Sequence, residues 1–176
     1  MRSVFVIFFW GMLFAGSVLA ERADRDKPIY LESDRATVEN TSRSNSEDRI
    51  SVFTGNVVLT QGTLVIRSDK MVVKEDADGF HNVTAYGNLV SFRQKRDGMN
   101  EYIEGWSERM EYDSKTEKVE LFKQARLKRG LYEVRGDYIS YEATTEFFQV
   151  NNGAKTKIKP NSRVHVIIQT KNKKKN

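Results

Sequence analysis

Apolar and polar residues alternate along most of the chain. Pro28 and Pro160 lie near its two ends, so the residues between them contain no proline, which cannot donate to a β-ladder. Apolar residues recur two apart, with charged or polar residues between them, at Val57/Leu59, Leu64/Ile66, Met71/Val73, Met110/Tyr112, Val119/Leu121 and Ile139/Tyr141. A period of two places one face of a strand against a core and the other in water. The pattern predicts an all-β chain.

Glycine, in most cases next to asparagine or aspartate, interrupts this alternation at short intervals. The interruptions include Thr54-Gly55-Asn56, Gln61-Gly62, Asp78-Gly79, Tyr86-Gly87-Asn88, Asp97-Gly98, Arg129-Gly130 and Asn152-Gly153. At about 5–6 residues per strand plus a turn, the roughly 130 residues between the two prolines form roughly 15 strands. That many short antiparallel strands must close into a sandwich, roll or barrel. Residues 40–48, NTSRSNSED, are polar throughout and are predicted to form an exposed loop.

A short phrase also recurs along the chain. LESDRA at 31–36 returns as IRSDKM at 66–71, loosely as WSERM at 106–110, and as VRGDYI at 134–139. The repetition predicts a stack of hairpin-like units, each resting on the last. The recurring Asp34, Asp69 and Asp137 are interpreted as caps of turns or strand starts, because such side chains bond to their own backbone there.

The two ends of the chain differ from its body. Residues 3–19 read SVFVIFFWGMLFAGSVL after the single charge of Arg2, and Val18 and Ala20 are small residues suited to signal peptidase. The alternative, a retained membrane anchor, requires about 20 apolar residues, so the segment is short for a span. The predicted organisation is a signal peptide at 1–20 cleaved after Ala20, one β domain at 21–168, and a basic disordered tail at 169–176.

Composition and charge exclude several classes of function. The 176 residues include no cysteine and two histidines, so disulfides, thiolate metal sites and thiol nucleophiles are excluded. The formal net charge is +5, but eight of the basic residues lie in 155–176 and one is Arg2. Residues 21–154 therefore carry 20 basic against 24 acidic residues, a net charge of −4. A mildly acidic body with a basic end argues against nucleic acid as a partner.

No arrangement of side chains indicates catalysis, a cofactor or a metal. His81 and His165 belong to no nucleophile motif, and phosphate loops and dinucleotide fingerprints are absent from the sequence. Strict alternation places Glu108 on the opposite face from Glu111 and Asp113, which argues against paired carboxylates. The sequence thus predicts a binding protein rather than an enzyme. Alternation alone does not distinguish a filled core from a lined cavity; the inward candidates are Ile29, Leu31, Phe92, Ile103, Met110, Tyr112, Phe148 and Val150.

Several phrases, taken together, resemble the LptA (OstA-like) family of periplasmic bridge proteins in lipopolysaccharide transport. They are DKPIYLESD at 26–34, FTGNVVLTQGT at 53–63, SDKMVV at 68–73, AYG at 85–87 with SF at 91–92, IEG at 103–105 and RGDYISY at 135–141. The resemblance implies an antiparallel β-jelly roll, open along one side, with an apolar interior groove. It implies a non-enzymatic carrier that shields lipid A while lipopolysaccharide crosses the periplasm from the inner to the outer membrane.

The same resemblance implies binding residues and partners. Matching positions place lipid A contacts at Ile29, Leu31, Phe92 and Tyr112, and alternation extends the site to Ile103 and Met110. The implied partners are lipopolysaccharide, the inner-membrane-anchored and outer-membrane components of the machinery, and further copies joined head to tail through edge strands. Two alternatives stay open: a membrane-anchored relative of the same fold, and a structural or glycan-binding envelope module with a filled core.

Overall fold

The computed structural model of the protein describes residue 24 and residues 27–43, 46–79, 81–96, 98–154, 157–158 and 163–169. The predicted signal peptide and most of the predicted basic tail lie outside these ranges. The described residues form twelve strands: β1 Tyr30–Glu32, β2 Arg35–Arg43, β3 Ser46–Gln61, β4 Leu64–Glu75, β5 His81–Lys95, β6 Tyr102–Asp113, β7 Lys118–Arg129, β8 Tyr132–Glu142, β9 Phe147–Asn151, β10 Gly153–Ala154, β11 Lys157–Ile158 and β12 His165–Ile168. The prediction of an all-β chain is confirmed.

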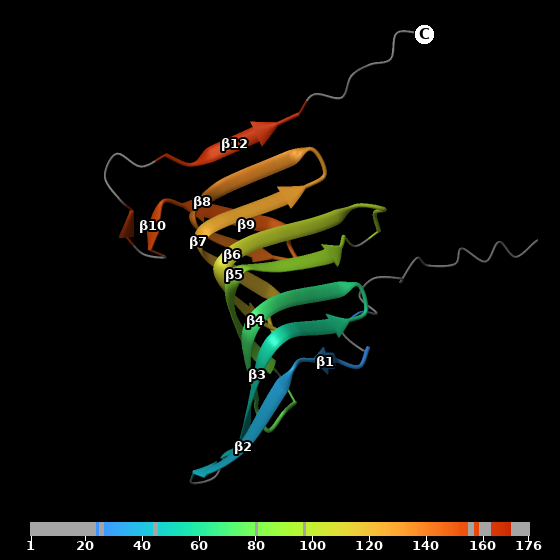
Figure 1. Ribbon diagram of the computed structural model, residues 1–176. Helices are drawn as coiled ribbons and strands as arrows, with labels where there is room; N and C mark the ends of the chain where they lie inside the picture. The colour runs from blue at the N-terminus through green and yellow to red at the C-terminus, as the bar shows by residue number, and fades with distance from the viewer. Residues whose placement is uncertain are drawn as a thin grey trace, which may run out of the picture.

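Ten of these strands form one antiparallel sheet in which chain neighbours pair. The order is β1-β3-β4-β5-β6-β7-β8-β12, while β2 also pairs with β3 and β9 also pairs with β8 (Figure 1). Each edge of the sheet is therefore made of two short strands, β1 with β2 at one edge and β12 with β9 at the other. The remaining strands, β10 and β11, pair with each other.

The six long strands bend near their middle instead of ending there. The pairing register shifts between Thr54 and Val57 in β3, between Tyr86 and Val90 in β5, and between Phe122 and Ala125 in β7. Each shift marks a β-bulge in that strand. The prediction of turns at 54–56 and 86–88 is wrong, because both segments are bulges within a strand. Strands of 11 to 16 residues therefore replace the roughly 15 short ones expected.

The sheet folds over along this line of bends into two layers (Figure 1). The pairing divides the strands as follows. Layer 1 holds β1, β12 and the half-strands 57–61, 64–67, 90–95, 102–106, 125–129 and 132–135; layer 2 holds β2, β9 and the half-strands 49–54, 70–75, 81–86, 109–113, 118–122 and 138–142. Inward side chains of both layers form one apolar cluster.

The recurring acidic residues lie on the line of bends, where Asp34 and Asp69 bind the bulge of the next strand and Asp137 binds the start of β10. The carboxylate of Asp34 accepts a hydrogen bond from Asn56 Nδ2 at 3.0 Å, that of Asp69 from the Asn88 N–H at 3.2 Å, and that of Asp137 from the Gly153 N–H at 3.1 Å. The interpretation of these residues as caps of their own backbone is thus wrong. A bulge leaves backbone and side-chain donors without a ladder partner, and a carboxylate on the neighbouring strand supplies one.

The loop predicted at residues 40–48 is largely β-ladder. β2 continues to Arg43 and β3 begins at Ser46, with Asn40 opposite Arg49 and Arg43 opposite Ser46. This hairpin extends away from the two layers (Figure 1). A polar sequence suits such an arm because its ladder satisfies backbone groups without needing a buried face.

Gly55 lies at the bend of β3, where the Asp34 side chain leaves no room for a larger residue. Its φ is +80°, and a Cβ added there would overlap the carboxylate of Asp34. Gly79 also has a φ of +80° but meets nothing within 4 Å, so it is a matched control for backbone strain alone. We expect Gly55→Ala to lower the free energy of unfolding by about 1–2 kcal/mol more than Gly79→Ala, measured by urea denaturation. Equal losses would show that Asp34 does not hold this bend.

Candidate functional site

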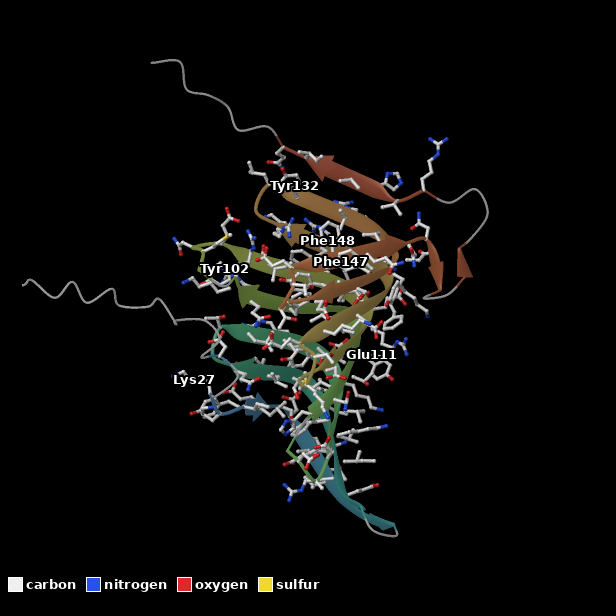
Figure 2. All side chains as sticks on the ribbon, turned by 180° about the vertical axis from the view of Figure 1, so that it is seen from behind. Lys27, Tyr102, Glu111, Tyr132, Phe147 and Phe148 are labelled. Carbon is white, nitrogen blue, oxygen red and sulfur yellow. The ribbon has the colours of Figure 1, made fainter. Side chains whose placement is uncertain are left out.

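The interior between the two layers is a continuous apolar cluster that reaches both edges of the sheet. Its centre is fully buried, and six partly buried hydrophobic residues pack against that centre. They are Ile29, Leu31, Phe53, Ala143, Phe148 and Val150. Ile29 and Leu31 lie at the β1 edge and Phe148 and Val150 lie on β9 at the opposite edge, so accessible apolar surface is found where the two layers end. Figure 2 shows Phe147 and Phe148 on β9 at the back of the molecule.

All six predicted site residues lie in this cluster, at two different depths. Phe92, Ile103, Met110 and Tyr112 are 2%, 1%, 0% and 8% exposed. Ile29 and Leu31 are only partly buried. The sequence pattern missed Phe53 on β3, which two features indicated: it lies two residues before Gly55, and it begins the phrase FTGNV.

The centre of the cluster is packed and leaves little room between neighbouring strands. Phe92 on β5 lies directly across from Gly105 on β6. A Cβ at Gly105 would overlap the Phe92 ring and approach Leu121 to 3.0 Å. Ile29 and Leu31 are therefore partly accessible from outside, whereas Phe92, Ile103 and Met110 are enclosed between the two layers.

Tyr112 differs from the other buried candidates because one side of it meets polar groups. It lines a hollow of about 630 Å³ together with Val83, Lys74, Asn82 and Lys118, among others. Charged and apolar groups thus meet at this end of layer 2, which suits an amphipathic ligand better than a purely apolar one.

An ionic contact joins the tips of the two layers. Arg96, at the end of β5 in layer 1, donates from Nε and Nη2 to the carboxylate of Glu146 in the β8–β9 turn, at 2.9 and 2.6 Å. Arg96 Nη1 also donates to Glu101 at 2.8 Å. Arg129 adds a longer contact of 3.9 Å to Glu146, and its guanidinium lies 5.5 Å from the centroid of the Phe148 ring. We call Arg96, Arg129 and Glu146 the clasp.

The clasp is strong for a surface contact because Arg96 is largely covered. Its side chain is 10% exposed, and a bidentate arginine–carboxylate pair is the best geometry that two such groups can adopt. The hydrogen bond from Arg96 lowers the pKa of the Glu146 carboxyl below its ordinary 4.5, although burial acts in the opposite direction. The same bond raises the pKa of Arg96.

Acid should therefore loosen the clasp. Because the folded state lowers the pKa of Glu146, the stability contributed by that charge is complete above pH 4.5 and is lost as the pH falls through the lower, folded-state pKa. We expect Glu146→Gln to cost about 1 kcal/mol at pH 7, since one third of this side chain is exposed and solvent screens it. The difference from the unmodified protein should shrink below pH 4.5 in urea titrations. A difference that does not change with pH would contradict this origin.

Among the described residues, no group of three or more histidine, aspartate or glutamate side chains is placed to hold a metal ion. The same part of the chain contains no helical segment with the length and hydropathy of a membrane span.

Comparison with known proteins identifies the class. Residues 30–147 match the family described as LptA/(LptD N-terminal domain) LPS transport protein. The chain is 28% identical over 157 residues to the lipopolysaccharide export system protein LptA of Haemophilus influenzae, covering 87% of each chain. It is 32% identical over 133 residues to LptA of Escherichia coli K12, covering 73% of this chain and 68% of that one.

A solved structure supports the fold independently of those sequences. The structure matches LptH, the LptA-homologous periplasmic component of the lipopolysaccharide transport device of Pseudomonas aeruginosa, with a TM-score of 0.74. The match covers 84% of this chain and 99% of that chain, at 22% identity. The predicted β-jelly roll is thereby confirmed.

The family match places this molecule among transport proteins, not enzymes, as the sequence predicted. The chain belongs to the LptA/(LptD N-terminal domain) family of lipopolysaccharide transport proteins. It is a periplasmic LptA homologue.

Proposed function

We propose that the chain carries lipopolysaccharide between the two membranes with the acyl chains of lipid A held in the apolar interior. The observation that supports this most directly is the apolar cluster that reaches both edges of the sheet, with Leu31 at one edge and Phe148 at the other. Burial is worth about 0.8 kcal/mol for each CH₂, so one chain of about 12 carbons gains roughly 10 kcal/mol by leaving water. Several such chains cannot cross an aqueous compartment without a cover of this kind.

The proposed lipid A site consists of Ile29, Leu31, Phe92, Ile103, Met110 and Tyr112. Ile29 and Leu31 make the first contacts because they are partly exposed, and the four buried residues follow once the layers separate. A photoreactive residue at Leu31 should form an adduct with lipopolysaccharide, while the same residue at Tyr30, which points outward and is 63% exposed, should not. Equal adducts at both positions, or none at Leu31, would reject an interior site.

The proposed partners are the inner-membrane-anchored and outer-membrane components of the machinery, together with further copies of the chain. The edges formed by β1 with β2 and by β12 with β9 would make these joints by adding strand to strand. A head-to-tail stack aligns the apolar interiors of successive copies, since both edges carry partly buried apolar residues. Lipid could then pass along the stack without entering water.

For the chain ends we propose export with cleavage after Ala20, a β domain at 21–168 and a basic tail at 169–176. The apolar run of 3–19 and the small residues Val18 and Ala20 support the cleavage. N-terminal sequencing of the exported protein tests it. A chain that starts at Met1 would indicate the membrane-anchored alternative.

A further inference from the structure

The line of bends places residues of β3 to β8, and the residues just beyond β1 and just before β12, in a single row across the outside of the sheet. Asn88 binds Asp69 and Gln124 binds Glu108, while the pairing of Val57 with Ser68 puts Asn56 beside Asp69. Continuing the pairing across all strands gives the following row: Asp34, Asn56, Asp69, Leu89, Glu108, Gln124, Asp137 and Arg163. We call this the bend row.

Acidic and non-acidic members alternate in the bend row without exception. The first three acids each face a bulge of the next strand and accept a hydrogen bond from it: Asn56 Nδ2 donates to Asp34, the Asn88 N–H to Asp69, and Gln124 Nε2 to Glu108 at 2.8 Å. The fourth, Asp137, accepts from the Gly153 N–H instead. Lys123 Nζ adds an ion pair with Glu108 at 3.6 Å. The alternation follows from the fold, because bulges occur on every second strand.

The two ends of the row are complementary. At the β1–β2 edge the row begins with an acid, Asp34, which is exposed. At the β9–β12 edge the row ends with a cation, Arg163, which is also exposed. The side chain of Asn152 links the Arg163 backbone to Asp137. Its Nδ2 donates to the Arg163 carbonyl, and its Oδ1 accepts from the Asp137 N–H. The outer neighbour that would continue the alternation is a non-acidic residue for Asp34 and an acid for Arg163, and the exposed charge of Asp34 favours a cation.

We infer that a second copy of this chain continues the bend row, with Arg163 of one copy forming an ion pair with Asp34 of the next. The inference rests on the proposed head-to-tail stack and specifies its register. β1 and β12 run antiparallel to the strands that cover them, β3 and β8, so β12 of one copy can pair antiparallel with β1 of the next. With Arg163 opposite Asp34, His165 falls opposite Glu32 and Ile167 opposite Tyr30.

This register also places inward-facing residues of one copy opposite inward-facing residues of the next. Leu31 points inward because it pairs with the buried Leu59, and Val166 points inward because it pairs with the buried Val134. The register places Leu31 opposite Val166, so the apolar interior continues across the joint. A shift by one residue would place Leu31 opposite an outward residue and break that continuity.

Charge reversal tests the ion pair. Asp34→Arg alone and Arg163→Asp alone each place like charges at the joint, and each should weaken self-association by about tenfold or more in sedimentation velocity. An equimolar mixture of the two variants restores opposite charges at every joint and should recover association close to that of the unmodified protein. Thermal melting of each variant checks folding, because Asp34 also holds Asn56.

Engineered cysteines test the register, since the natural chain has none. A chain carrying Tyr30→Cys and Ile167→Cys should oxidise to a ladder of disulfide-linked oligomers. The pairs Tyr30→Cys with Val166→Cys, and Tyr30→Cys with Ile168→Cys, differ by one residue and should link at least about tenfold less, because their side chains point to opposite faces.

The outcomes separate the inference from the proposal on which it rests. If the unmodified protein associates but the mixed variants do not recover, the Asp34–Arg163 pair is wrong while the stack stands. Preferential linking of a shifted cysteine pair would reject the register in the same way. If the unmodified protein shows no association at any concentration tested, both the stack and the pair are rejected.

Discussion

Phe92→Ala is expected to lower the free energy of unfolding by about 3–5 kcal/mol, a large share of the roughly 5–15 kcal/mol that stabilises a typical domain. The reason is that the Phe92 ring fills the space above Gly105 and next to Leu121, and is 2% exposed. Deleting it leaves a cavity that the two layers cannot close without moving their backbones. Urea denaturation followed by circular dichroism measures the loss.

Tyr86→Ala provides the control on the same strand. Tyr86 is 41% exposed on β5, so its truncation should cost less than about 1 kcal/mol. A loss below about 1 kcal/mol for Phe92→Ala would mean that the centre of the interior is not packed in solution. The free protein would then hold an open groove, and lipid could enter without separation of the layers.

Leu31→Asp is expected to weaken the binding of lipid A by at least about tenfold. It places a carboxylate among the partly buried apolar residues of the β1 edge, where the acyl chains are proposed to make first contact. An unpaired charge in an apolar environment costs at least about 1–3 kcal/mol, and 1.4 kcal/mol is tenfold in affinity. Titration of the protein with fluorescent lipid A at concentrations below self-association measures the change.

Tyr30→Asp is a matched control for this substitution. Tyr30 is the preceding residue on β1, points to the opposite face, and is 63% exposed. It introduces the same charge at the same edge without entering the interior, so lipid A affinity should stay within about twofold. Equal losses in both variants would indicate an electrostatic effect of the edge instead of an interior site.

The two predictions describe different stages of one process. Ile29 and Leu31 are available in the structure as it stands, whereas Phe92, Ile103 and Met110 are enclosed. In the proposed function, lipid reaches the enclosed residues when the tips of the layers separate, and the clasp of Arg96 with Glu146 joins those tips. A bound lipid would supply the apolar contacts that the separated layers lose, which lowers the free energy of the open state.

Alternation in the sequence predicted the inward or outward direction of some side chains correctly and of others wrongly. Alternation at Val57/Leu59 and Met110/Tyr112 placed their inward faces correctly, because each pair lies within one uninterrupted half-strand. Glu108 was placed wrongly: the burial pattern of β6 has two outward residues in succession at Glu108 and Arg109, so Glu108 shares the outer face with Glu111 and Asp113. Strict alternation fails wherever a strand crosses the line of bends.

The turn-like phrases show the same limit. Gly55-Asn56 and Gly87-Asn88 have the composition of a hairpin turn, and local composition does not distinguish a turn from a bulge. The neighbouring strand decides between a turn and a bulge. Asp34 and Asp69 supply hydrogen-bond acceptors to Asn56 and Asn88, so each strand bends there and continues. Those acceptors lie 19 to 22 residues away in sequence, beyond the reach of any local pattern.

The sequence by itself determined the all-β class, the inward residues of each half-strand, the absence of thiol chemistry and the family, because these follow from short-range periodicity, composition and order of phrases. Only the tertiary structure decided that the interior is filled at Phe92 and accessible at Leu31, that Arg96 and Glu146 join the layers, and that the acidic repeats form one row ending in Asp34 and Arg163. These features depend on which strands lie side by side and how the sheet folds, and that is set by contacts between residues far apart in the chain.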